Sequence, residues 1–356
     1  MRGSRNKDFP KGKVLIFLLI NLKISRFFPK NFLIYLKCKV KKTFRGKEND
    51  AGMKKLCKEL KKNRVLFLML IPSIVIIILT AYIPMSGLVL AFKNYRYDRG
   101  IFGSDWCGFG NFGYFFKSGT GLRVTRNTVV YNLMNLITSQ ILSLFVAIVI
   151  SEMTGRIFKK IVQSVTFLPY FISWIIVGAF VYNIFNYESG VMNSIVTALG
   201  GERINVYQMP SVWKWIIMFF NSWKWVGYNS VIYIAAILGV DANCHEAAAI
   251  DGANIFQRIY YITLPSIKPT IIVILLLQVG RIMRGDFQMF YQIVGNNGQL
   301  FNATDVIDTY VFRALVTSGD IGMTAAATFY QSVLCFIIIT TVNAIVKKID
   351  SDYALF

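Results

Sequence analysis

Six apolar runs, each long enough to cross a lipid bilayer as a helix, dominate this sequence. They lie at about residues 65–92, 128–150, 161–185, 212–240, 269–293 and 323–346. A helix needs about 20 apolar residues to cross the hydrocarbon core, where the backbone has to satisfy its own hydrogen bonds. Apolar residues make up 55% of the chain and the mean hydropathy is +0.50, which is too high for a soluble domain. We therefore expect an all-α integral membrane protein with six spans.

Positive charge is concentrated before the first span. Residues 1–64 contain 20 Lys and Arg against four acidic residues, and the net charge of all 356 residues is +21. Basic segments beside spans remain on the cytoplasmic side, next to anionic lipid. The sequence thus predicts two parts, a basic cytoplasmic N-terminal extension at 1–64 and a six-span domain at 65–356, with both termini in the cytoplasm. A start codon placed too far upstream is an alternative explanation of the extension.

The sequence lacks the residue patterns that catalysis, metal binding, nucleic-acid binding and ATP hydrolysis require. The five cysteines form no CxxC pair and His245 is the only histidine, so neither a metal site nor a nucleophile with its base is expected. No zinc-ligand spacing or nucleic-acid-binding motif accompanies the basic charge. The chain contains no GxxxxGK[ST] phosphate loop, which an ATPase would need. We expect no catalytic residues, no bound cofactor or metal, and no nucleic-acid partner.

The connection at 241–268 is longer than a simple link between two spans requires. Asp241 is suited to cap a helix, and alanine and glutamate, both good helix formers, fill much of the stretch that follows. Gly252 stands where a helix ends in a left-handed residue, and Pro265 is expected to end the next turns. Small alanines permit close approach of another backbone, and Glu246 adds one charge. We expect this loop to dock against another protein.

The same loop resembles the signature of permease subunits in bacterial ATP-binding-cassette (ABC) importers. That signature reads EAA, three residues, G, nine residues, I, one residue, LP, and the matching positions are Glu246, Ala247, Ala248, Gly252, Ile262, Leu264 and Pro265. In that family the loop forms a coupling helix that inserts into a groove on a cytoplasmic ATPase. The resemblance implies that Glu246 anchors the docked helix, that Asp251 belongs to the same surface and that Gly252 sets the angle of the turn.

The resemblance also implies partners and a location. Six spans form half of a pathway with pseudo-two-fold symmetry, so the chain would pair with a second, related permease in a bacterial plasma membrane. Two ATPase subunits would bind ATP and Mg²⁺ and attach from the cytoplasm, and an extracellular solute-binding protein would deliver the substrate. The chain itself would be a non-catalytic transport subunit in contact with membrane lipid.

The sequence around the loop is similar to the carbohydrate branch of these permeases. The similarity is carried by AAILGVDANCHEAAAIDGANIFQRIYYITLPSIKPTI, while YRYDRGIFGSDWCGFGNF and DVIDTYVFRALVTSGD resemble a polysaccharide-associated subgroup. The expected substrate is an oligosaccharide, with peptides, amino acids and phosphate as alternatives. Cys244 and His245 replace the Leu-Tyr that is usual in this branch. Arg281 and Arg284 stand where the subgroup commonly has small or apolar residues.

Polar residues recur at spacings of three or four in the fifth run, at Gln278, Arg281, Arg284 and Gln288. Most of them would share one helix face, with Asp286 nearby. Ionisable groups at membrane depth normally face a cavity or each other. A substrate path that binds sugar hydroxyls, or the carboxylates of acidic sugars, is one interpretation. The alternatives are an Arg284–Asp286 pair, packing against the partner permease, or an outer mouth where Gly280 and Gly285 end the helix.

The fourth run contains a cluster of aromatic and polar residues at Trp223, Lys224, Trp225, Tyr228 and Asn229. Aromatic rings stack on sugar rings, so Trp223, Lys224 and Tyr228 are further candidates for the substrate path. Tryptophan and tyrosine also anchor helices at the membrane surface, which is the alternative. Asn132 and Asn135 in the second run are expected to bond to other helices rather than to substrate.

Two functions from other classes remain as alternatives. A secondary transporter driven by an ion gradient would show paired repeats and more spans. A membrane anchor or sensor would need a soluble output domain, and no loop is long enough to form one. Six spans with the signature loop favour the ABC importer permease.

Overall fold

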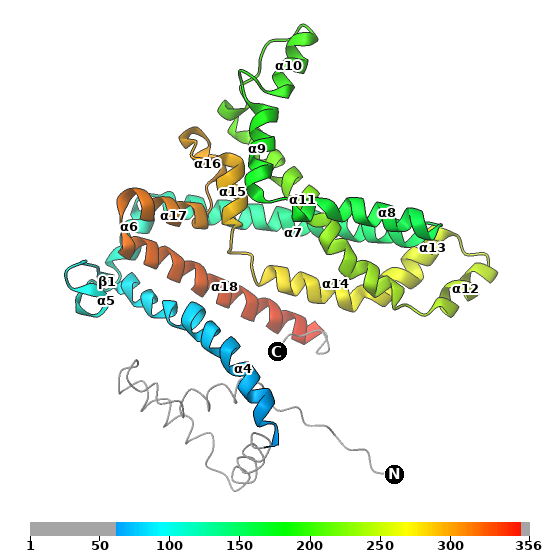
Figure 1. Cartoon of the computed structure of the whole chain (residues 1–356), viewed down its shortest axis with the longest axis horizontal. Helices are drawn as coiled ribbons and strands as arrows, with labels where there is room; N and C mark the ends of the chain where they lie inside the picture. Colours follow the sequence, from blue (N-terminus) through cyan, green and yellow to red (C-terminus); the bar gives the residue numbers. More distant parts are fainter. Residues whose placement is uncertain (1–61, 350–356) are drawn as a thin grey trace. The chain divides into compact units, whose positions relative to one another are not determined.

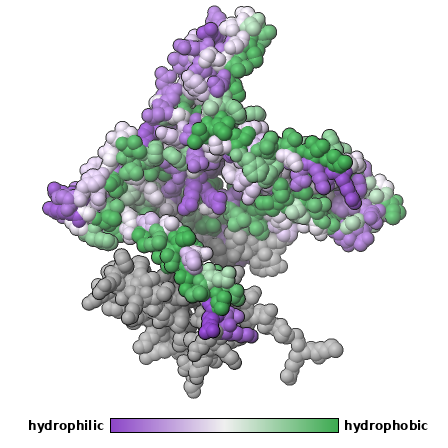
Figure 2. All heavy atoms as spheres, viewed as in Figure 1, coloured by the Kyte–Doolittle hydropathy of each residue, from purple (hydrophilic) through white to green (hydrophobic). Residues whose placement is uncertain are grey.

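A computed structural model describes residues 62–349, in two units divided between Tyr82 and Ile83. Residues 1–61 and 350–356, and with them nearly all of the predicted basic extension, lie outside the described residues. The first unit contains α4 (Arg64–Ile77), which continues as the π-helical turn η2 (Ile78–Tyr82). Apolar side chains cover α4 (Figure 2), and most of them are exposed. A helix that is apolar on all sides is suited to lipid.

The second unit, from Ile83 onward, is built mainly from helices. Its one described sheet is a short antiparallel pair, β1 (Lys93–Asn94) and β2 (Asp105–Trp106). The helices up to residue 238 are η3 (Pro84–Phe92), α5 (Gly100–Gly103), α6 (Gly110–Lys117), α7 (Thr120–Glu152), α8 (Arg156–Phe167), η4 (Leu168–Phe171), α9 (Trp174–Phe185), α10 (Val191–Ala198), η5 (Val206–Gln208) and α11 (Pro210–Leu238). Those that follow are α12 (Ala242–Ile250), α13 (Ile255–Arg258), η6 (Ile259–Thr263), α14 (Leu264–Val279), α15 (Phe287–Val294), η7 (Gly298–Leu300), α16 (Phe301–Thr304), α17 (Ile307–Ser318) and α18 (Ile321–Ile349). The expected all-α class is confirmed.

Four stretches within the described residues are long and apolar enough to cross a membrane: Arg64–Phe92, Thr120–Glu152, Ile255–Val279 and Ile321–Lys348. The number rises to six if each of two bent pairs is one span, namely Arg156–Phe171 with Trp174–Phe185 and Pro210–Leu238 with Ala242–Ile250. In the second pair we assign the span to α11 alone, because 29 residues at about 1.5 Å each already exceed the roughly 30 Å core.

The third expected span, 161–185, is not one continuous helix. α8 and η4 pack on α11, and the chain then turns by 92° into α9 (Figure 1). Pro169 in η4 lacks the N–H that would continue a helical ladder. Ser173 then caps α9 by accepting a hydrogen bond from the Ile176 N–H at 3.4 Å. The sequence therefore places a breaker and a cap within four residues.

The side chain of Lys224 in α11 bonds to the backbone at this break. Its Nζ donates hydrogen bonds to the carbonyl oxygens of Tyr170, at 3.0 Å, and of Ile172, and it lies 5.1 Å from the centre of the Trp174 ring. The lysine is buried, and it supplies hydrogen bonds to two carbonyl groups that the helix break leaves without helical partners. Trp174 in turn donates from Nε1 to the carboxylate of Asp286 at 3.0 Å. One cation and one indole thus join the break to the start of α15.

The fifth expected span, 269–293, has different bounds in the structure at both ends. Its helix begins at Ile255 and passes through the π-helical η6 into α14. Pro265 does not end a helix, contrary to the expectation, because it lies in the first turn of α14, directly after η6. A π-helical turn shifts the hydrogen-bond ladder, so the missing N–H of the proline leaves no gap. The helix ends at Val279, and the expected span is divided before α15 begins.

Helices α7 and α11 pack on each other more extensively than any other described pair. A cluster of buried side chains from α7, α9, α11 and α15 forms the main core and includes Tyr131, Trp174, Trp213 and Phe290. Gly227 brings α11 against the backbone of α8, because a Cβ at this position would lie 1.9 Å from the carbonyl oxygen of Thr166. No side chain fits into such a gap, so the two helices touch backbone to backbone.

We expect Gly227→Ala to destabilise the protein by about 3 kcal/mol or more, since the backbone of α8 has to move to admit the methyl group. The measurement is the apparent melting temperature of the detergent-solubilised protein. Gly113→Ala in α6 is the matched control, because a Cβ there meets nothing within 4 Å. Equal melting temperatures for the two variants would contradict the close contact.

We expect Lys224→Met to lower stability by about 1–3 kcal/mol, because two partly buried carbonyl groups lose their donor. Lys214→Met is the control on the same helix, since no hydrogen bond or ion pair of Lys214 occurs among the described residues. Melting temperatures in detergent compare the two. If Lys214→Met is the more damaging change, Lys224 does not hold the break.

Candidate functional site

The stretch after α11 forms an exposed helix and a tight turn. Asp241 accepts the N–H of Asn243 at 3.0 Å and so caps α12. Gly252 has a φ of +81°, and the N–H of Ala253 donates to the carbonyl of Ala248 at 2.8 Å. This is the left-handed ending that the sequence predicts, since glycine adopts positive φ without strain. Asn254 then caps α13, so the chain reverses within a few residues.

The signature residues are divided between this turn and the following helix. Glu246, Ala247, Asp251 and Gly252 are exposed, and Ala248 is half-buried. Ile250, at 87% exposed, and Phe256, at 78%, add apolar surface beside them. Ile262, Leu264 and Pro265 instead lie within η6 and the start of α14. The residues from Glu246 to Gly252 therefore form an exposed surface, whereas Ile262, Leu264 and Pro265 belong to the helix that follows it.

A second feature is a polar cavity of about 170 Å³ between α7, α11 and the end of α14. Its lining comprises Asn132, Asn135, Leu136, Ser139, Asn221, Trp225, Asn229, Gln278, Arg281, Ile282 and Arg284. Amides, one hydroxyl and two guanidinium groups predominate, and no carboxylate is present. Figure 2 shows polar residues gathered over the connection between α14 and α15, with apolar surfaces beside them.

The residues between α14 and α15 carry both arginines into this cavity. The single helix face expected from Gln278 to Gln288 is wrong, because α14 ends at Val279 and Gly280 follows as its cap. A helix that ends near Gly280 is one of the alternatives that the sequence raises, and the structure has this helix end. Arg281 and Arg284 nevertheless both line the cavity, since the turn brings them to the same side.

Side chains from three helices hold this connection. Asn132 of α7 donates from Nδ2 to the carbonyls of Ile282 at 2.8 Å and of Arg284 at 3.0 Å. The expected bond from Asn132 to another helix goes instead to the backbone between α14 and α15, and the one expected from Asn135 does not form at its Oδ1 atom, which has no partner. From α18, Gln331 donates from Nε2 to the carbonyl of Met283 at 2.6 Å. The connection is irregular but not loose.

A carboxylate completes this support. Asp308 of α17 accepts the N–H of Gly285 at 2.7 Å and the Nε2–H of Gln331 at 3.0 Å. Burial raises the pKa of the Asp308 carboxyl above its ordinary value, while its hydrogen bonds and the charge of Arg284 lower it. Its position, in the first turn of α17, lies outside the expected spans.

The remaining predicted path residues lie outside the cavity lining. Asp286 caps α15 by accepting the N–H of Met289 at 3.1 Å and also binds Trp174, so the Arg284–Asp286 pair does not form. Gln288 is exposed on α15, and Trp223 packs beside the main core. Lys224 is engaged at the break described above. Tyr228 stacks on Tyr170, with ring centres 4.4 Å apart.

The residues of α11 that line the cavity are not the ones that the sequence analysis proposed for the substrate path. The residues that line the cavity are Asn221, Trp225 and Asn229, which recur every four positions and therefore share one helix face. Asn135 and Ser139 on α7 have the same spacing, and Asn229 donates to Ser139 at 2.9 Å. A search for polar residues at this period would have found both faces.

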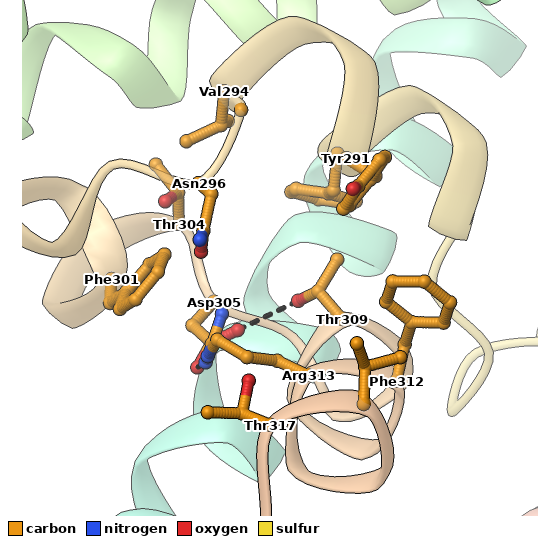
Figure 3. A pocket seen from close by; sticks show the side chains of 13 residues that line it. Tyr291, Val294, Asn296, Phe301, Thr304, Asp305, Thr309, Phe312, Arg313 and Thr317 are labelled. Carbon is orange, nitrogen blue, oxygen red and sulfur yellow. Dashed lines mark hydrogen bonds and ion pairs between the residues drawn. The ribbon is translucent and has the colours of Figure 1, made fainter.

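A smaller cavity of about 90 Å³ lies among α15, α16 and α17 (Figure 3). Arg313 points to Asp305, which also accepts the hydroxyl of Thr309 at 2.7 Å, and the guanidinium lies 3.7 Å from the Phe301 ring centre. Burial raises the pKa of Asp305, and Thr309 and Arg313 oppose the shift. Because every charged group here has a partner, we interpret the cluster as a clamp between α16 and α17.

Comparisons with known proteins agree with the signature. The family described as binding-protein-dependent transport system inner membrane component matches residues 140–351. Protein LplB of Bacillus subtilis (strain 168) is 32% identical over 293 residues, which cover 82% of this chain and 92% of LplB. The polygalacturonan/rhamnogalacturonan transport system permease protein YteP of the same organism is 30% identical over 299 residues, 84% of this chain and 92% of YteP.

A solved structure extends the similarity to the fold. The crystal structure of a bacterial ABC transporter involved in the import of the acidic polysaccharide alginate contains a chain with a TM-score of 0.75 and 30% sequence identity. The match covers 83% of this chain and 99% of that chain. Since the family match spans more than half of the sequence, this chain belongs to the binding-protein-dependent transport system inner membrane components and is a multi-pass transport permease.

Proposed function

We propose that the chain is the oligosaccharide-conducting permease of an ABC importer in a bacterial plasma membrane. It forms half of a path together with a second, related permease. Two separate ATPase subunits, which bind ATP and Mg²⁺, drive the transport, and an extracellular solute-binding protein delivers the substrate. Both termini of the chain lie in the cytoplasm, on the side where the basic residues before the first span are concentrated.

The polar cavity is the main observation that supports an oligosaccharide as the substrate. Its lining offers amides that both donate and accept hydrogen bonds, and the indole of Trp225 lies among them. The Oδ1 atom of Asn135 and the Oε1 atom of Gln278 are buried without a hydrogen-bond partner. Unpaired buried acceptors are unfavourable until a donor arrives. Sugar hydroxyls supply such donors, and a sugar ring presents an apolar face for an indole.

The exposed α12 supports the coupling to an ATPase. The helix presents Glu246 and Ile250 away from the core, and the Gly252 turn fixes its direction relative to α13. Because α11 leads directly into α12, a shift of the docked helix reaches the cavity-lining residues of α11. Rocking of the spans between inward-facing and outward-facing states would follow from closure of the ATPases.

Purification from native membranes in mild detergent tests the assembly. We expect an ATPase with a phosphate loop and a second six-span protein to accompany the chain. Deletion of the chain should then abolish uptake of one class of labelled oligosaccharide. If instead the uptake of a peptide, an amino acid or phosphate depends on the chain, the protein belongs to a non-sugar importer. If the chain is purified alone, the alternative of an ion-driven transporter is favoured.

We expect Glu246→Lys to reduce uptake by about tenfold or more, because an interface loses an anchor and gains a wrong charge. Stability should stay almost unchanged, since the side chain is exposed. Glu202→Lys, at an exposed position between α10 and α11, is the charge-matched control. Normal uptake with Glu246→Lys, at equal protein levels, would rule out the anchoring role.

A further inference from the structure

The two arginines of the cavity have no counter-ion among the described residues. Neither Arg281 nor Arg284 takes part in the ion pairs of residues 62–349, which are Arg96–Asp98, Arg99–Asp105 and Arg313–Asp305. Both arginines are exposed and line the cavity, whose lining contains no acidic residue. Positive charge that lines a cavity without an acidic neighbour attracts anions.

The nearest carboxylates are already engaged by other groups. Both oxygens of Asp286 accept hydrogen bonds, one from the Met289 N–H and one from Trp174 Nε1. The Oδ2 atom of Asp308 accepts two hydrogen bonds, from the Gly285 N–H and from Gln331. Arg284 is close enough to influence the pKa of Asp308, but it donates no hydrogen bond to it. The two acids therefore bond to backbone N–H groups and to the side chains of Trp174 and Gln331, and neither forms an ion pair with the arginines that line the cavity.

The backbone that carries the arginines is fixed. Hydrogen bonds from Asn132 and Gln331 bind three consecutive carbonyls, those of residues 282–284. Support of this kind keeps the two guanidinium groups on one side of the cavity. A guanidinium presents a planar fork of donors that matches a carboxylate with two parallel hydrogen bonds. Neutral hydroxyls alone would be served by the amides that already line the cavity.

We propose that the substrate is an anionic oligosaccharide, and that Arg281 and Arg284 bind its carboxylate groups during passage. This inference rests on the proposed function, because it assigns a substrate class to the same cavity. The unpaired amide oxygens of Asn135 and Gln278 receive hydroxyl groups of the same sugar unit. The arginines thus provide selection by charge, and the amides provide hydrogen bonds to the ring substituents.

The test uses the complete transporter in cells and three labelled probes of equal length. These are a galacturonic acid trimer, its methyl ester, which is neutral on the same backbone, and a galactose trimer. We expect uptake of the acidic trimer to depend on the chain. The double variant Arg281→Gln, Arg284→Gln should lower this uptake by about tenfold or more, as when hydrogen bonds to a charged group are lost. Arg281→Lys, Arg284→Lys should retain more uptake than the glutamine variant, since charge is kept.

Arg203→Gln is the matched control, because Arg203 is exposed and lies outside the cavity lining. Membrane protein levels and copurification of the ATPase show whether each variant assembles. A second measurement needs no variant: the acidic trimer should raise the apparent melting temperature of the purified wild-type transporter, and the methyl ester should not.

The outcomes separate the two proposals. If uptake of only the neutral sugars depends on the chain, the charge inference is overturned and the proposed function stands. Unchanged uptake of the acidic trimer by the glutamine variant also overturns it, as does equal stabilisation by the acid and the ester. If no oligosaccharide depends on the chain, the proposed function itself fails.

Discussion

Backbone groups that leave a helix inside a membrane span require new hydrogen-bond partners, and three polar side chains of the spans meet this requirement. The chain departs from helix at two places inside expected spans, after Phe171 and after Val279. Lys224 bonds the carbonyls at the first place, and Asn132 and Gln331 bond those at the second. Polar residues that have no such duty, notably Asn135 and Gln278, are left to face a cavity. The two kinds of residue cannot be told apart by polarity alone.

The class of the fold could be predicted from hydropathy and length, and the turn at Gly252 from helix-ending chemistry. The breaks could not, because an average over an apolar run does not register where the hydrogen-bond ladder is interrupted. Pro169 and Gly280 were visible signals, but Pro265 is an equally strong one and does not interrupt its helix. Its effect depends on the π-helical turn before it, and such turns are too rare to be expected from the sequence.

Only some of the residues that line the cavity could be predicted, because the break after α14 was not expected. Arg281 and Arg284 do meet there, yet through a turn rather than through a shared helix face. Lys224 was proposed as a path residue because it lies in an aromatic and polar cluster, whereas its amine bonds to the backbone of the neighbouring segment. Asn221 was not singled out, and Asn229 was named in the cluster of the fourth run but not as a path residue, because single amides are common in membrane helices. Their spacing of four around Trp225 was the signal that both share one helix face.

The contact between Gly227 and Thr166 has a mechanical consequence. Two helices separated by side chains can slide past each other by rotamer changes, but backbones in direct contact have no such freedom. The first part of the third span, α8, is therefore held directly against α11. We expect a rotation of α11 to carry α8 and the 92° bend with it, and to move α9 and α15 together, because these two helices pack on each other.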